Sequence, residues 1–163
     1  MDKLYIVMPA YNEEANIEAV VSQWHPLVEK IGSDSRLVVM DDGSKDHTYE
    51  KLKDLQKKFP QLVGVTKENE GHGATVLRAY HYAVDHGADY VFQTDSDGQT
   101  LPEEFWPLWE NRQRGGAADR TEKRPRRWDI QGFCHAGAPA GLVRCISCVG
   151  KGCKHTISID EGE

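Results

Sequence analysis

The sequence predicts an α/β fold in which an open parallel sheet is flanked by helices. Two observations support this prediction. Short apolar runs alternate with amphipathic stretches over residues 3–111, and such alternation of strands and helices is typical of a parallel sheet. Three of the apolar runs also end in polar loops. Because ligands bind outside the carboxyl ends of the strands in open sheets of this kind, we expect these loops to meet at one edge.

Four strands are expected where short apolar runs rich in valine, leucine and isoleucine occur, at residues 4–8, 36–40, 62–66 and 89–93. Helices are expected where apolar residues recur at helical spacing, at residues 12–30, 46–58 and 73–86 and again from about residue 102. Asn12 is expected to cap the first helix, and Pro26 to kink or split it. Asp46 or Ser44 is expected to cap the second, and Leu77 to face inward from the third.

The most informative site signal is a pair of carboxylates at the end of the fourth strand. Asp95 and Asp97 follow the apolar run Tyr90–Gln93 and are two residues apart, so they share one face of an extended chain. Hard oxygen ligands suit Mg²⁺ or Mn²⁺, and such sites often complete their shell with substrate phosphates. The pair therefore points to a nucleoside-diphosphate substrate, and the alternative is an ordinary acidic turn.

Three further polar motifs follow other elements. Asp42 closes the second strand, where its carboxylate can accept hydrogen bonds from sugar hydroxyls or ring N–H groups; the alternative is turn chemistry with Gly43. Glu13 follows the first strand, where it can contact a ligand or favour the helix dipole. Gly71 and Gly73 precede the third helix and let the backbone approach a ligand closely; the alternative is a flexible loop.

Taken in order, these motifs resemble those of family 2 glycosyltransferases with the GT-A (Rossmann-like) fold. The resemblance covers about residues 3–111 and is nearest the branch of dolichyl-phosphate mannosyl- and glucosyltransferases. It is carried by the segments Met8–Glu14, Asp41–Ser44, Asn69–Gly73 and Asp95–Asp97. It implies that the donor is bound by Pro9, Tyr11, Glu13, Asp42, Gly71 and Asp95, and that Mg²⁺ or Mn²⁺ is bound by Asp97 and Asp95. No general base is identifiable.

The resemblance implies transfer of a sugar from a UDP- or GDP-linked donor to an acceptor such as a polyprenyl phosphate at the membrane surface. In an inverting enzyme, an acceptor oxygen would displace the nucleoside diphosphate directly. Two alternatives stay open: a non-catalytic nucleotide-binding remnant, and a nucleotidyltransferase. The latter should show a Gly-rich, Lys- or Arg-containing signature after its first strand, and residues 9–13 do not match it.

The composition of the chain limits the classes of partner and the locations that we expect for it. The net charge of −6 argues against nucleic-acid binding. No apolar run approaches the roughly 18 residues of a membrane span, and no basic segment followed by an apolar core opens the sequence. We therefore expect a cytoplasmic protein, or one peripheral at the cytoplasmic face of the membrane. All four cysteines lie after residue 133, so most of the chain contains none.

Residues 112–163 differ in character from the predicted half-domain of residues 1–111. The cysteine spacing around Cys145, Cys148, Cys153 and His155 resembles a zinc knuckle. A frameshift is the more economical interpretation. Read one nucleotide out of frame, the codons permitted for Asp129–Gly162 can encode an amphipathic helix and an Asp-containing segment typical of this branch of the family. We therefore expect an aberrant or disordered tail and a GT-A domain that is incomplete at its C-terminus.

Overall fold

The computed structural model describes residues 2–110, 133–136, 142–146 and 157–158. Within them, one sheet has the strand order β3-β2-β1-β4-β5-β6-β7. Strands β1 to β4 pair in parallel, as predicted, whereas β5 to β7 extend the sheet by antiparallel pairing. The strands are β1 Leu4–Ala10, β2 Arg36–Asp41, β3 Leu62–Thr66, β4 Tyr90–Gln93, β5 Phe133–Ala136, β6 Leu142–Ile146 and β7 Ile157–Ser158.

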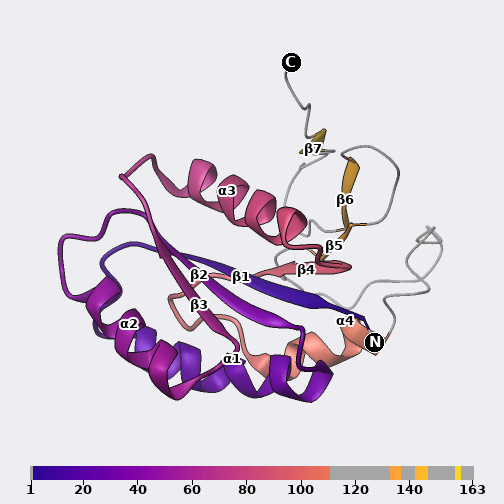
Figure 1. Cartoon of the computed structure of the whole chain (residues 1–163), viewed down its shortest axis with the longest axis horizontal. Helices are drawn as coiled ribbons and strands as arrows, with labels where there is room; N and C mark the ends of the chain where they lie inside the picture. Colours follow the sequence, from indigo (N-terminus) through magenta and orange to yellow (C-terminus); the bar gives the residue numbers. More distant parts are fainter. Residues whose placement is uncertain (1, 111–132, 137–141, 147–156, 159–163) are drawn as a thin grey trace.

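Helices cover both faces of the parallel part of the sheet. Helix α3 lies over one face, and α1, α2 and α4 lie over the other (Figure 1). This layered arrangement is the α/β architecture that the sequence predicts. The helices are α1 Ile17–Ile31, α2 Thr48–Lys58, α3 His72–Asp85 and α4 Phe105–Glu110, with a 3₁₀ turn η1 at Pro102–Glu104.

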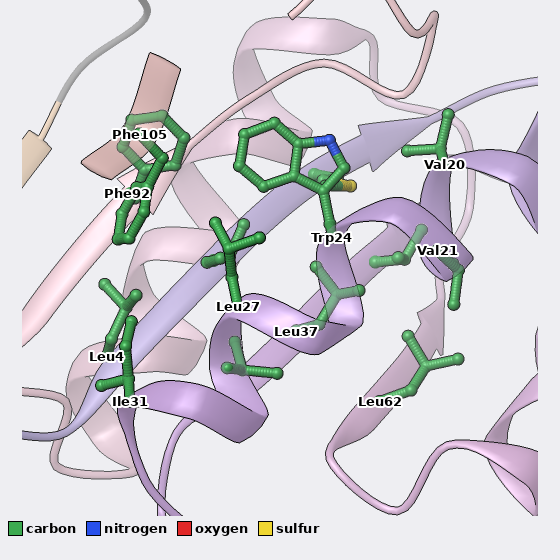
Figure 2. Close-up of a cluster of buried hydrophobic side chains, with 14 of the residues drawn as sticks. Leu4, Val20, Val21, Trp24, Leu27, Ile31, Leu37, Leu62, Phe92 and Phe105 are labelled. Atoms are coloured by element: carbon green, nitrogen blue, oxygen red, sulfur yellow. The ribbon is translucent and has the colours of Figure 1, made fainter. Parts of the chain in front are cut away.

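The central strand β1 is buried along its whole length, as expected of a parallel strand that is covered on both faces. Alternate residues of β1 therefore enter two separate cores, with Ile6 facing α1 and Val7 facing α3. On the α1 face, Trp24 stacks on Phe92 with ring centroids 5.7 Å apart, and Figure 2 shows Phe92 beside Phe105 in the same cluster. This packing holds the ends of β1 and β4 in place.

Two local predictions about the helices are wrong, and a third is wrong in part. Helix α1 begins at Ile17 and not at Asn12, because Asn12 adopts a positive φ of 55° and uses its side chain in a contact with another loop. Pro26 lies inside α1 and does not split it, while a kink at Pro26 stays a prediction. Leu77 is 39 % exposed, because the buried face of α3 is formed instead by Thr75, Ala79, Tyr80 and Ala83.

Neither predicted cap of α2 occupies the N-cap position, because the helix begins at Thr48 and His47 precedes it, with no capping hydrogen bond from its side chain. Asp46 lies one residue further back, and its carboxylate accepts a hydrogen bond from the Thr48 backbone N–H at 3.0 Å. Strands β5 to β7 fall within residues 112–163. Cys148, Cys153 and His155 lie outside the described residues, and only the backbone of Cys145 is described, so the frameshift and the zinc alternative stay predictions.

Candidate functional site

The four polar motifs meet in one cleft at the carboxyl edge of the parallel strands. Its volume is about 460 Å³. All seven residues expected to bind the donor or the metal line it, and their individual roles stay predictions. The lining consists of Pro9, Ala10, Tyr11, Glu13, Asp42, Asn69, Gly71, His72, Thr75, Asp95, Ser96 and Asp97. The topology produces this gathering, because β1, β2 and β4 are parallel neighbours that end at the same edge.

The β1–α1 loop forms one wall of the cleft. Tyr11 is 43 % exposed there, so its ring is accessible to a ligand. The Glu13 backbone N–H donates to the Thr48 hydroxyl at 2.9 Å, and the Glu13 carboxylate accepts from the Asn16 side chain at 2.9 Å. The loop is therefore held by α2 while Tyr11 and Glu13 face the cleft.

The two aspartates at the end of β2 have different surroundings. Asp41 is buried, does not line the cleft, and accepts hydrogen bonds from the Thr66 hydroxyl at 2.6 Å and the Ser44 N–H at 3.3 Å. Asp42 lines the cleft. Asp41 is thus a structural residue that joins β2 to β3 and to its own following loop, and Asp42 is the one placed to meet a ligand.

Asp42 is the most strongly perturbed carboxylate of the cleft. It is only 4 % exposed, and burial alone would raise its pKa. Hydrogen bonds from the Lys67 ammonium, the Glu70 backbone N–H and the Thr75 side chain outweigh burial and hold the pKa at about 2. The Gly71 N–H also donates to it at 2.9 Å. Asp42 is therefore ionised at neutral pH and can only accept hydrogen bonds from a ligand.

The loop before α3 packs closely on the end of β2. A Cβ on Gly43 would lie 2.9 Å from the Asn69 backbone nitrogen, so glycine is required there. The Asn69 side chain donates to the Asp42 carbonyl oxygen at 2.9 Å. Gly71, with φ of 90°, precedes α3, and the space around Gly71 and Gly73 is open. The first turn of α3 therefore presents backbone N–H groups beside the cleft.

Asp95 and Asp97 line the cleft from the loop that follows β4. Asp95 is partly buried and Asp97 is exposed. Between them, the Ser96 hydroxyl donates to the Pro9 carbonyl oxygen at 2.9 Å and joins this loop to β1. The Asp97 carboxylate accepts from the Gln99 backbone N–H at 3.0 Å, which holds its own loop.

The chemistry of this pair fits a hard divalent cation. Two carboxylates supply oxygen ligands and leave coordination positions for water and for the phosphates of a substrate, which is how Mg²⁺ is commonly held. In the part of the chain that the structure describes, no group of three His, Cys, Asp or Glu side chains could hold a metal ion. Asp95 and Asp97 are thus the residues that would hold such an ion here.

Sequence reasoning missed three residues of this region. Thr75 lies one turn into α3 and donates its hydroxyl to the Gly71 carbonyl oxygen at 2.9 Å. Ser96 gave no signal of its own in the sequence, because it lies between two aspartates that are the more obvious candidates. Lys67, 10 % exposed as a side chain, pairs with Asp42. A buried threonine at helical spacing from Gly71 was a weak signal for Thr75, whereas the sequence contained no local signal for the long-range contact of Lys67.

Arg78 does not line the cleft. It makes a two-point ion pair with Glu70, with both N–O distances at 2.7 Å. Arg78 is therefore an ion-paired residue on the surface of α3. No helix within the described ranges combines the length and the apolar character that crossing a membrane requires.

Comparisons with known proteins agree with this geometry. Over 118 residues the chain is 32 % identical to the UDP-N-acetylglucosamine–dolichyl-phosphate N-acetylglucosaminyltransferase of Methanococcus voltae, covering 64 % of the chain and 45 % of that protein. Over 101 residues it is 32 % identical to the dolichol-phosphate mannosyltransferase of Pyrococcus furiosus, covering 62 % of the chain and 27 % of that protein. The chain thus spans less than half the length of these relatives.

A solved structure shares the fold. The crystal structure of S. aureus TarS 1–349 in complex with UDP-GlcNAc superposes with a TM-score of 0.57 at 19 % identity, covering 80 % of this chain and 39 % of that one. The family model described as "Glycosyl transferase family 2" matches residues 5–128, which include all four motifs of the cleft. The chain therefore belongs to glycosyl transferase family 2.

Proposed function

We propose that this chain provides the donor-binding half of a metal-dependent glycosyltransferase, which moves a sugar from a nucleoside-diphosphate donor to an acceptor. The observation that carries the proposal is the cleft itself, where an ionised buried carboxylate, an open helix N-terminus and a pair of carboxylates face one space of about 460 Å³. These groups complement the hydroxyl or ring N–H groups of such a donor, its phosphates, and the cation that accompanies the phosphates.

The donor would lie in this cleft, between the loop that follows β1 and the first turn of α3. Asp42 would accept a hydrogen bond from the base or the ribose, with Pro9, Tyr11 and Glu13 beside it. Gly71 would let the backbone approach the ligand. The relative from Methanococcus voltae is named for a UDP-linked sugar, which supports a uridine nucleotide, and a guanosine nucleotide is the second candidate.

Asp97 and Asp95 would hold Mg²⁺ or Mn²⁺. Such an ion stabilises the negative charge of a leaving nucleoside diphosphate. The exposed Asp97 is the better placed of the two for direct coordination, while the partly buried Asp95 would contact the ion or the ribose.

The acceptor is proposed from the relatives, which are named for dolichyl phosphate and dolichol phosphate. A polyprenyl phosphate acceptor would require the enzyme to act at a membrane surface. We propose that this surface is the cytoplasmic face of the membrane. A nucleotide-binding remnant remains the alternative for this chain, because the general base and most of the acceptor site are not identified in it. Membership of family 2 favours sugar transfer over nucleotidyl transfer.

Calorimetric titration of UDP and GDP, with and without Mn²⁺, tests the donor site. Binding that requires Mn²⁺ and is lost in Asp97→Ala, but kept in Asp54→Ala on the exposed face of α2, is the expected result. No binding by the folded wild type would overturn the proposal. Metal-dependent binding without sugar transfer to a polyprenyl phosphate would identify the remnant.

A further inference from the structure

Four charged side chains form a continuous row that begins at the donor cleft and ends on the outer surface of α3. The Lys67 ammonium donates to Asp42 and lies 3.3 Å from the Glu70 carboxylate. Glu70 in turn pairs with Arg78. Two positive and two negative charges alternate along this row, so each inner charge has neighbours of the opposite sign.

The row is buried at the cleft and exposed at its far end. The side chains of Asp42 and Lys67 are 6 % and 10 % exposed, whereas those of Glu70 and Arg78 are 39 % and 57 % exposed. Removing one partner of a buried ion pair strongly destabilises the folded protein, because the other charge then stays buried without compensation. An exposed pair contributes less. Lys67 is therefore the member of the row that matters most to Asp42.

Lys67 is also the only charged donor to Asp42 among the described residues. The other hydrogen bonds to this carboxylate come from neutral groups, which are the backbone N–H groups of Glu70 and Gly71, both at 2.9 Å, and the Thr75 side chain. Without the ammonium, these neutral donors would still orient the carboxylate, but burial would then work against its charge. The side chain at position 67 therefore affects the ionisation of the Asp42 carboxylate more than the orientation of that carboxylate.

We propose that Lys67 is a positioning residue for donor binding, which keeps the cleft carboxylate Asp42 ionised so that it accepts hydrogen bonds from the ligand, and that the Glu70–Arg78 pair holds Lys67 beside Asp42. The inference rests on the proposed function, since it assumes that Asp42 contacts the nucleotide. Lys67 itself does not line the cleft, so it acts through Asp42.

Two variants of Lys67 separate charge from packing. Lys67→Met keeps the aliphatic length and removes the charge, and Lys67→Arg keeps the charge. Lys57→Met, in an exposed ion pair on α2, is the matched control. UDP and GDP affinities with Mn²⁺ are measured by calorimetry from pH 8 to pH 5. The other titratable side chains of the cleft, which are common to all variants, are Tyr11, Glu13, His72, Asp95 and Asp97.

We expect Lys67→Met to bind at least about tenfold more weakly at pH 7 than Lys57→Met, and to lose further affinity relative to that control as the pH falls towards 5. Lys67→Arg should recover most of the affinity. An affinity for Lys67→Met within threefold of the control at every pH would overturn the inference and leave the donor site standing. No binding by the wild type would overturn both.

The exposed end of the row gives a second test that does not depend on the folding of Lys67→Met. Arg78→Gln removes the pairing to Glu70 and Arg78→Lys retains a positive charge. We expect Arg78→Gln to weaken donor binding by about two- to fivefold and Arg78→Lys to weaken it less. Equal binding by Arg78→Gln and the wild type would overturn the role of the Glu70–Arg78 pair.

Discussion

The Asn12 side-chain oxygen accepts a hydrogen bond from the Lys45 backbone N–H at 2.9 Å, and this contact joins the loops that follow β1 and β2. The Asn12 N–H donates in turn to the Ser44 hydroxyl at 2.9 Å. Asn12 has a φ of 55°, a conformation that asparagine adopts more readily than most residues. The bridge places Tyr11 and Glu13, the neighbours of Asn12, on the wall of the cleft.

Substitution of Asn12 should therefore destabilise the protein in two separable ways. Asn12→Ala loses the side-chain hydrogen bond with Lys45 and places alanine, which tolerates this conformation less well than asparagine, at positive φ, so we expect a loss of about 2 kcal/mol in the free energy of unfolding. Asn12→Gly loses only that hydrogen bond and should cost about 1 kcal/mol. Urea denaturation measures both, and equal losses in the two variants would contradict the role of the backbone conformation.

Gly43 provides a prediction about the close approach of β2 to the loop before α3. An added Cβ would lie 2.9 Å from the Asn69 nitrogen and 3.0 Å from the Lys67 carbonyl oxygen, both backbone atoms that cannot move aside freely. Gly43→Ala should lower the free energy of unfolding by at least about 2 kcal/mol and weaken donor binding. The control is Gly87→Ala, which has a similar φ of 71° but only the Lys3 side chain nearby; it should cost about 1 kcal/mol. Similar losses in the two would refute the steric explanation.

The parallel sheet could be predicted from the sequence because its strands are apolar runs that end abruptly in polar residues. The carboxyl edge then follows from topology, so Tyr11, Asp42, Gly71 and Asp97 could be assigned to one site before any coordinates. The beginning of α1 could not be predicted. Asn12 has the local chemistry of a helix cap, but its side chain is used by Lys45, which is 33 residues away in sequence.

The interior of the site was harder to predict than its outline. The contact of Lys67 with Asp42 and that of Ser96 with Pro9 span 25 and 87 residues. Neither produces a periodicity or a motif, because each depends on how two strand ends meet. The antiparallel extension by β5 to β7 was also not predicted, since residues 112–163 show no regular apolar pattern.

The pKa of Asp42 makes a prediction about acid stability. Its pKa is lowered from 3.8 to about 2 in the folded protein, so the unfolded chain binds the proton more readily. The resulting stabilisation of about 2 kcal/mol is present above pH 4 and is lost as the pH falls from 4 towards 2. Unfolding free energies from pH 6 to pH 2.5 should show this loss in the wild type.

Two variants test the assignment to Asp42. Asp42→Asn should be less stable than the wild type at pH 7, because it leaves Lys67 buried without its partner, and it should lack this part of the acid dependence. Glu103→Gln on the exposed η1 turn is the control for loss of a carboxylate. An unchanged acid dependence in Asp42→Asn would show that other carboxylates dominate the transition.

Ser96 links the loop that carries Asp95 and Asp97 to the end of β1, and its removal should affect both stability and function. The hydroxyl is buried and donates to the Pro9 carbonyl oxygen. Ser96→Ala leaves that carbonyl without this donor, and we expect a loss of about 1 kcal/mol in the free energy of unfolding. Because Asp95 and Asp97 flank Ser96, the two carboxylates should also become less well placed for a shared cation.

Ser22→Ala on α1, which removes an exposed hydroxyl bonded within its own helix, should change neither property. Calorimetry with and without Mn²⁺ separates the effects: Ser96→Ala should weaken Mn²⁺-dependent nucleotide binding several-fold and leave Mn²⁺-independent binding nearly unchanged. A uniform decrease in both would mean that Ser96 supports the fold of the whole cleft, and no decrease in either would mean that the loop holds its carboxylates without the contact to Pro9.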